Sequence, residues 1–368
     1  MRFEELLLSA VLCAASASAR PSSSVPLTAL VDRADAIVVA SSRNGLQSGT
    51  AISFDLSVIR VVKGAAAAGS VVRITWTADE PISGVQELPN RTGIWFLKWN
   101  PSGETSALGI QVPALDLEDI YYPVPGPPRT GAYAGAGGES QIEVVVLELA
   151  AAIDAFGDKA PRGINHALLT AGPDRCARTY KRLLNCPSAY VRALALAGLI
   201  PSNDPSVVVQ IAKTLADLRK SPARGWIGVG LQSYFNTDPV GVAALGEIAA
   251  TAEGSDFIAE NAAFALVNIH TRDALPHLAR LLDSPNPKVQ SLAVSGISAF
   301  VQGLPVRKPA DAISMAWLKP AEKSGYLTDE VRPYLGMGDL RSDRATETVR
   351  FWKAWWTSHQ QELQSPKP

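Results

Sequence analysis

The histidines are the first side chains in this chain that could bind a metal ion. His270 and His277 are seven residues apart, and two imidazoles at such a spacing could share a metal. A predicted helix break at residues 271–273 separates them, and solvated histidines in turns and on helix faces are more common than ligands. We therefore assign no metal ligand to either side chain.

Acidic and glycine-rich segments offer two further kinds of chemistry. Asp116, Glu118 and Asp119 could bind calcium or act as acid and base, but a short acidic run is typical of a solvated loop. Residues 64–70 have the glycine spacing of a phosphate-binding loop, yet Ser70 stands where a lysine must reach the phosphates. Strand-forming residues follow, so this segment is predicted to be a hairpin loop.

Familiar catalytic and cofactor motifs are missing from the sequence. It has no Gly-x-Ser-x-Gly elbow, no His-Glu-x-x-His zinc motif and no spaced dinucleotide fingerprint. We therefore predict that the protein is not an enzyme and has no cofactor. No catalytic, cofactor-binding or metal-binding residue is assigned.

Cys176 and Cys186 are the cysteines that remain if the first 19 residues are removed. They have nine residues between them and could form a disulfide in an oxidising compartment. The alternative is a pair of buried thiols, because a free cysteine behaves as a small core hydrophobe. Zinc would need more ligands than two cysteines supply.

Residues 1–19 are predicted to be a secretory signal peptide. Arg2 precedes an apolar stretch at residues 6–15, and small residues at positions 17–19 provide a cleavage site. Glu4 and Glu5 make this segment less basic than a typical signal, and the alternative is a short buried helix. No apolar run reaches the roughly 20 residues that span a bilayer. We expect an exported protein, periplasmic or secreted, without a membrane span.

The charge balance gives no reason to expect a nucleic-acid partner. Removing Arg2, Glu4 and Glu5 from 34 basic and 35 acidic residues leaves 33 of each. A neutral chain does not attract a phosphate backbone. At 47% hydrophobic residues, the chain can still bury the cores of two domains.

The first half of the chain has the pattern of strands. Residues 36–42, 52–62, 71–77 and 93–99 are rich in Val, Ile, Thr and aromatics, with Gly, Pro and Asn between them. Apolar residues alternate at the start of 52–62 and then become continuous, which predicts one buried face followed by a bulge or a doubly covered end. A small antiparallel barrel or sandwich fits this pattern.

Residues 34–39, 54–64 and 93–97 resemble bacterial relatives of the netrin-like fold of metalloproteinase inhibitors, an OB-type barrel. The inhibitory members of that family chelate the metal with an N-terminal cysteine. The predicted mature start, Arg20-Pro21-Ser22, has none. The resemblance therefore implies a fold for residues 20–123 but no inhibitory residue.

A run rich in Pro, Gly and Ala at residues 124–138 is predicted to be a linker or exposed loop. Helical spacing begins after it. One apolar face is formed at 139–153, with Glu139 and Ser140 as start signals. The residues of that face are Ile142, Val145, Val146, Leu149 and Ile153.

Residues 273–300 predict a helix-turn-helix hairpin. The first helix has an apolar stripe at residues 275–282, a turn follows at 283–287, and a second helix has its stripe at residues 289–297. Small Ala293 and Gly296 would let the second helix approach a neighbour closely, and the first helix cannot bury its stripe without another hairpin. About ten helices are expected from residue 139 onward, two of them starting near Asp204 and Asp238.

This hairpin resembles the HEAT repeat family. Pro276 lies in the first helix, and the turn at Asp283 precedes Val289-Gln290, where many members have Val-Arg. The same internal spacing occurs three times along the chain: Val191, Ala195 and Leu199; Ile258, Ala262 and Leu266; Val289, Ala293 and Ile297. The resemblance implies an all-α solenoid over residues 139–302.

Residues 303–368 are predicted to form a C-terminal helical cap. Its last helix, near residues 345–360, carries Phe351, Trp352, Trp355 and Trp356 in one cluster. These aromatics could contact a partner or could cover the end of the repeats.

The predicted fold class is therefore multidomain and α+β, with a small N-terminal antiparallel barrel or sandwich followed by an all-α HEAT-like solenoid. The leading functional hypothesis is a non-enzymatic, extracytoplasmic protein-binding or scaffold module that uses the helical-repeat surface. The alternative is an inhibitor or accessory subunit that acts through the netrin-like barrel. In both cases the expected partner is another protein.

Overall fold

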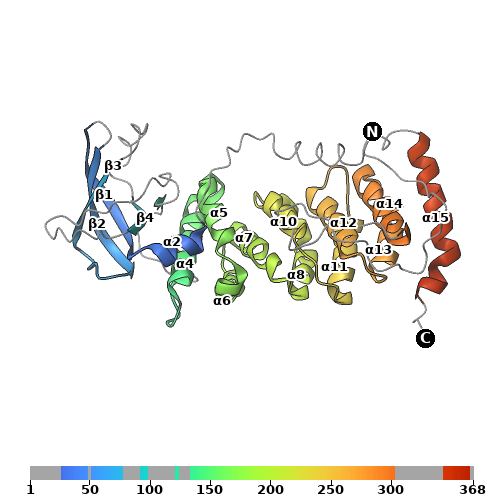
Figure 1. Ribbon diagram of the computed structural model, residues 1–368, viewed down its shortest axis with the longest axis horizontal. Coiled ribbons are helices and arrows are strands. Elements are labelled where there is room, and N and C mark those ends of the chain that lie inside the picture. Colours follow the sequence, from blue (N-terminus) through green and yellow to red (C-terminus); the bar gives the residue numbers. More distant parts are fainter. Residues whose placement is uncertain are drawn as a thin grey trace. The chain divides into compact units, whose positions relative to one another are not determined.

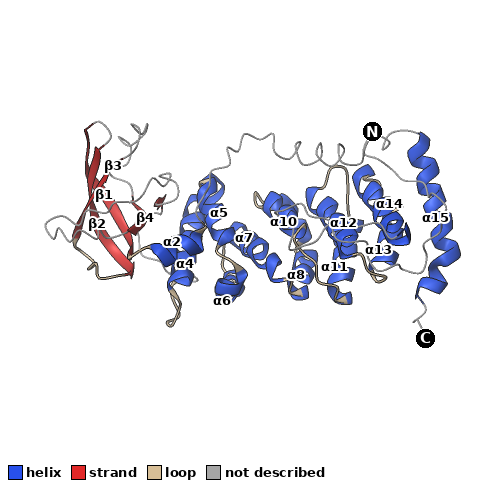
Figure 2. Cartoon of the chain, viewed as in Figure 1, coloured by secondary structure: helices blue, strands red, loops and turns tan. Residues whose placement is uncertain are grey.

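The computed structural model describes residues 26–48, 51–77, 92–97, 121–123, 133–302 and 343–364. The predicted signal peptide, the acidic residues 116–119 and residues 303–342 of the predicted cap lie outside this part of the chain. The chain is mostly helical, with a small antiparallel sheet near its N-terminus (Figures 1 and 2). Within the described residues, no helix is both long enough and apolar enough to cross a membrane.

Two compact units divide the chain at residue 198. The N-terminal unit is Ala19–Gly198, and the C-terminal unit contains Leu199–Pro368. The change from strands to helices near residue 125 falls inside the N-terminal unit. This unit contains both the sheet and the first helices. The separate β domain, linker and repeat segments stay a prediction.

The sheet has five antiparallel strands in the order β3-β2-β1-β4-β5. Four of them confirm the predicted strands, and the fifth, only three residues long, was not predicted. The segment 64–70 connects β2 to β3, as expected of a turn between antiparallel strands. The bounds are β1 Ala36–Ser48, β2 Ala51–Lys63, β3 Val71–Thr77, β4 Thr92–Leu97 and β5 Tyr121–Pro123.

Irregular pairing explains the change of pattern within β2. Ala40 and Val39 are adjacent in β1, but they pair with Val58 and Arg60, so Ile59 is an extra residue in β2. Two further register shifts occur in the same pair of strands, between Ile37 and Val38 and between Arg43 and Leu46 of β1. The bulge predicted from the sequence is therefore confirmed.

The helices of the N-terminal unit pack around α4, which contacts β2, α2, α5 and α6. Ser140 caps α4, and Glu143 completes the capping box, as the sequence indicated. The five apolar residues of the predicted face are fully buried. Helix α2 was not predicted. The bounds are α2 Leu27–Arg33, α4 Gln141–Phe156, α5 Arg162–Thr170, α6 Pro173–Leu183 and α7 Ala189–Leu199.

An ion pair joins the sheet to α4. The Arg60 guanidinium of β2 donates two hydrogen bonds to the Glu148 carboxylate, at 3.1 Å from Nε and 2.7 Å from Nη2. The Glu148 side chain is 2% exposed and that of Arg60 is 22% exposed. Two charges withdrawn from water in this way depend on each other.

The helices of the C-terminal unit pack in two layers. In one layer α8 contacts α11, and α11 contacts α13; in the other α10 contacts α12, and α12 contacts α14 (Figure 1). Contacts of α11 with α12 and of α13 with α14 join the layers, and α15 packs on α13 and α14. The bounds are α8 Pro205–Lys213, α9 Leu215–Lys220, α10 Arg224–Leu231, α11 Pro239–Ala250, α12 Phe257–Ile269, α13 Ala274–Leu281, α14 Pro287–Gln302 and α15 Asp343–Gln364.

Several predicted features of these helices are confirmed. Asp204 caps α8 and Asp238 caps α11, each followed by proline in the first turn. Helices α13 and α14 form the predicted hairpin, and the residues of both stripes are buried. The described residues from 139 onward contain twelve α-helices, two more than expected.

Small residues permit the closest helix contacts. A Cβ atom added at Gly296 of α14 would lie 2.7 Å from Leu278 and 3.1 Å from Val267, which confirms the predicted close approach. A Cβ atom at Gly246 of α11 would lie 2.6 Å from Cγ of His277 in α13. The two hairpins can therefore pack this closely only where one of them lacks a side chain.

The substitution Gly246→Ala tests this contact. We expect it to lower the free energy of unfolding by about 1–3 kcal/mol, because the new methyl group overpacks the His277 ring. The control is Gly225→Ala in α10, where an added Cβ meets no atom within 4 Å. That change should raise stability by up to about 1 kcal/mol through helix propensity. Urea unfolding measures the free energy of unfolding of both variants. Equal values for Gly246→Ala and Gly225→Ala would contradict the close packing at Gly246.

The variant Glu148→Ala tests the tie between the sheet and α4. It leaves the Arg60 charge partly buried without its partner and should cost about 2–4 kcal/mol in thermal or urea unfolding. Removing Asp32, whose ion pair with Arg175 is exposed on both sides, should have a much smaller effect. A similar loss in the two variants would show that burial does not set the strength of the Arg60–Glu148 pair.

Candidate functional site

The two histidines considered as metal ligands pack against different helices of the C-terminal unit. The ring of His270, which follows α12, lies 5.4 Å from the ring of Phe300 in α14. His277 packs against Gly246 in α11. Burial lowers the pKa of both imidazoles, so both are neutral at pH 7. In the part of the chain that is described, no group of three or more His, Cys, Asp or Glu side chains could hold a metal ion.

Cys176 and Cys186 are both free thiols in this structure, and both are buried. Cys176 lies near the start of α6, and the helix continues for seven residues to Leu183 before the turn that holds Cys186. At 1.5 Å per residue this separates them by about 10 Å, more than the roughly 7 Å between bridged Cα atoms. Burial raises the pKa of Cys176 to about 12, which makes it an unreactive thiol.

The aromatic cluster of α15 lies against the end of the C-terminal unit. Trp352 is fully buried and Trp355 is 7% exposed, and their rings meet edge to face at 5.6 Å. Helix α15, which carries both side chains, packs on α13 and α14, and the role of the cluster as a cap stays a prediction. Phe351 and Trp356 are half-buried, and a role of these two in partner binding stays a prediction.

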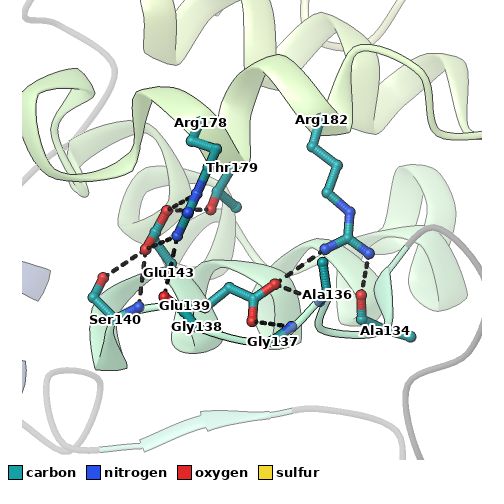
Figure 3. A network of polar contacts seen from close by, with 10 residues as sticks. All are labelled: Ala134, Ala136, Gly137, Gly138, Glu139, Ser140, Glu143, Arg178, Thr179 and Arg182. Carbon is teal, nitrogen blue, oxygen red and sulfur yellow. Dashed lines mark hydrogen bonds and ion pairs between the residues drawn. The ribbon is translucent and has the colours of Figure 1, made fainter.

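Glu139 fastens the glycine-rich segment before α4 to α6 (Figure 3). Its carboxylate accepts hydrogen bonds from the backbone N–H groups of Ala136 and Gly137 and pairs with Arg182 at 3.3 Å. The hydrogen bond from Ala136 is the largest of the effects that hold the pKa of Glu139 below its ordinary value. Residues 133–138, the described part of the predicted linker, are thus tied to a helix of the same unit.

Glu143 forms the second half of this network (Figure 3). Its carboxylate accepts hydrogen bonds from the backbone and the hydroxyl of Ser140, from Arg178 and from Thr179, at 2.9 to 3.1 Å. Burial raises the pKa of Glu143, but these donors outweigh it and the net shift is downward. A carboxylate saturated by donors is a weak base, so the network positions the segment and is poorly suited to proton transfer.

The C-terminal unit has a hollow of about 390 Å³ at the start of α12. This volume lies at the small end of the range for binding sites. Phe257 is 43% exposed there, which is unusual for a large aromatic side chain. The lining residues are Arg219, Arg224, Glu253, Ser255, Asp256, Phe257 and Ile258.

One of the two arginines of the hollow is engaged within the protein. Asp256 caps α12 by accepting the N–H groups of Ile258 and Ala259, and it also pairs with Arg219. The guanidinium of Arg224, in the first turn of α10, has no hydrogen bond or ion pair in the described part of the structure. The hollow therefore offers a guanidinium beside an exposed ring, a combination suited to a carboxylate next to an apolar group.

This hollow was not predicted from the sequence. Residues 219–234 show no clear periodicity, and Phe257 precedes the apolar stripe of α12 by one position. The hydrophobic pattern therefore does not mark either of them as part of a binding site. A usable signal was present in Asp256. Asp256 is an acidic cap directly before an aromatic residue, which places Phe257 in the first turn of α12.

Comparison with known proteins identifies no relative. No family model, no curated protein and no solved structure matches the chain.

The variant Glu143→Gln tests the polar network of Figure 3 through its pH dependence. Because the folded-state pKa of Glu143 lies below its ordinary value of 4.5, the carboxylate stabilises the fold above that pH. This stabilisation is lost as the pH falls through the folded-state pKa. The difference in unfolding free energy between wild type and variant should therefore be largest at neutral pH and shrink on acidification. The control is Glu347→Gln, at an exposed position of α15. A difference for Glu143→Gln that is constant with pH would contradict the network.

Proposed function

We propose that the protein is an extracytoplasmic protein-binding or scaffold module that contacts its partner through helices of the C-terminal unit. The observation that carries this proposal is the stacking of hairpins in two layers, in which equivalent helices of successive hairpins contact each other. Stacking of this kind leaves a continuous row of helices exposed along each layer. Such rows serve as binding surfaces in repeat proteins.

Matching burial supports a HEAT-like repeat. The three sets of residues that share the same internal spacing all lie in helices, and each member is at most 1% exposed. The sets occupy α7, α12 and α14. Equivalent positions thus perform the same packing role, as expected when one helical unit recurs along a chain.

A polar tie between successive hairpins also supports the array. The amide of Asn286, before α14, donates to the Gly254 carbonyl and to Glu260, and its oxygen accepts the N–H of Val289. Lys288 pairs with Glu260 at 3.2 Å. The turn of one hairpin is therefore bonded directly to the second helix of the hairpin before it, which fixes their relative position.

The extracytoplasmic part of the proposal depends on residues 1–19. Their pattern of Arg2, an apolar stretch and small residues is that of a signal peptide. Export would place the partner in the periplasm or outside the cell.

A second candidate function is an inhibitor or accessory subunit that acts through the sheet. The strand order β3-β2-β1-β4-β5 favours it, because an OB-type barrel is a five-stranded Greek key in which the first strand pairs with the second and the fourth. This function would place the partner on the N-terminal unit.

Photo-crosslinking in the producing cells distinguishes the two functions. A photo-reactive residue is introduced in the full chain at Val229, at Val240 or at Val71, which are 52%, 60% and 61% exposed. Val229 and Val240 lie in the two layers of the C-terminal unit, and Val71 lies in the sheet. We expect one reproducible protein adduct from Val229 or Val240, suppressed by an excess of the unmodified protein.

The other outcomes are equally informative. An adduct from Val71 alone would support the inhibitor or accessory function and overturn the scaffold proposal. The absence of a competed adduct at all three positions would overturn both proposals.

A further inference from the structure

The helices α10, α12 and α14 form a layer whose charges lie along one edge. Each contains a single charged residue, Arg224, Glu260 or Lys288, within its first four positions. The three helices begin at the same edge, because Lys288 pairs with Glu260 and Arg224 lines the hollow with the first residues of α12. Beyond its first turn, every helix of the layer is uncharged.

The opposite layer has a different character. Glu247 lies in the interior of α11 and pairs with Arg280 of α13 at 2.9 Å, with both side chains about half exposed. Charged residues are depleted from the centres of protein interfaces, where desolvation costs most. The layer of α10, α12 and α14 therefore suits a partner better than the layer of α8, α11 and α13.

Apolar side chains reach the surface of the uncharged layer. Phe257 and Val229 are exposed, and Phe264 lies two turns after Phe257 on the same face of α12, where it is half-buried. Leu292 of α14 is also half-buried. A ring held in place is a better anchor than a mobile one, and Phe257 packs against the α10 backbone, with its ring 2.5 Å from a Cβ added at Gly228.

The charged side chains at the edge of this layer indicate which charge the partner should carry. Arg219 is neutralised by Asp256, and Lys288 by Glu260. Arg224 keeps an unpaired charge four residues before Gly228, on the side of α10 that faces Phe257. Glu253 lies on the rim of the same hollow, in the turn before α12. The cation that borders the apolar patch directly is therefore Arg224.

We propose that the layer of α10, α12 and α14 binds a polypeptide segment whose apolar side chains cover Phe257, Val229 and Phe264 and whose carboxylate pairs with Arg224. This inference rests on the proposed function and specifies the surface and the partner's chemistry. Arginine binds a carboxylate with two parallel hydrogen bonds, which fixes the direction in which the segment lies. The hollow of about 390 Å³ beside Phe257 accommodates one apolar side chain of the segment.

Random peptides displayed on phage and selected on the purified full chain test this inference. The enriched peptides should combine apolar residues with Asp or Glu. A synthetic peptide of that group should lose at least about tenfold in affinity for Phe257→Ser and for Arg224→Glu. Exchanging its acidic residue for lysine should restore binding to Arg224→Glu, which a merely structural effect of that variant would not do.

The control is Val240→Ser, an apolar position in the opposite layer that is 60% exposed, compared with 43% for Phe257. It should change the affinity by less than about twofold. Circular dichroism melting checks that each variant is folded. Enriched peptides that bind all variants equally, or that are basic, would overturn this surface and leave the proposed function standing. If no peptide is enriched, the inference also fails, whereas the crosslinking experiment still decides the proposed function.

Discussion

The packing of the C-terminal unit depends on one constraint: no hairpin can bury its apolar stripe alone. Helix α12 shows this most clearly, because it contacts α10, α11, α13 and α14, and its stripe of Ile258, Ala262 and Leu266 is almost fully inaccessible. Each neighbour supplies part of that burial, so the stability of one hairpin depends on the next. Hydrophobic burial alone would leave the separation and register of neighbouring hairpins adjustable. The hydrogen bonds of polar groups at the turns fix both.

Elements with strong periodicity could be predicted from the sequence, and elements stabilised by distant contacts could not. The stripes of α4 and α14 and the Asp-Pro starts of α8 and α11 are local signals, and each gave a helix in the expected place. Helix α10 contains three glycines among eight residues, so its intrinsic helix propensity is low, and it gains support from packing against α12. The strand β5 is too short to carry a pattern, and its pairing with β4 depends on residues far apart in the chain.

The candidate site was predictable only in part for the same reason. Sequence spacing identified the aromatic cluster of α15, but it could not show that Trp352 would be buried and Phe351 half-buried, because this depends on how α15 lies on α13 and α14. The sequence separation of Cys176 and Cys186 was compatible with a disulfide or with two buried thiols. It could not show that most of helix α6 lies between them. Ion pairs such as Arg182 with Glu139 join residues 43 positions apart, and no local pattern indicates which charges will meet.

We propose that a protein partner contacts the helices of the C-terminal unit and not the sheet. Hydrogen–deuterium exchange of the full chain, free and bound to the protein recovered by crosslinking, distinguishes these two surfaces. Binding to the helices should slow exchange in α10 and at the start of α12, with no change in β1 to β4. Slower exchange confined to the strands would contradict it and would assign partner binding to the N-terminal unit.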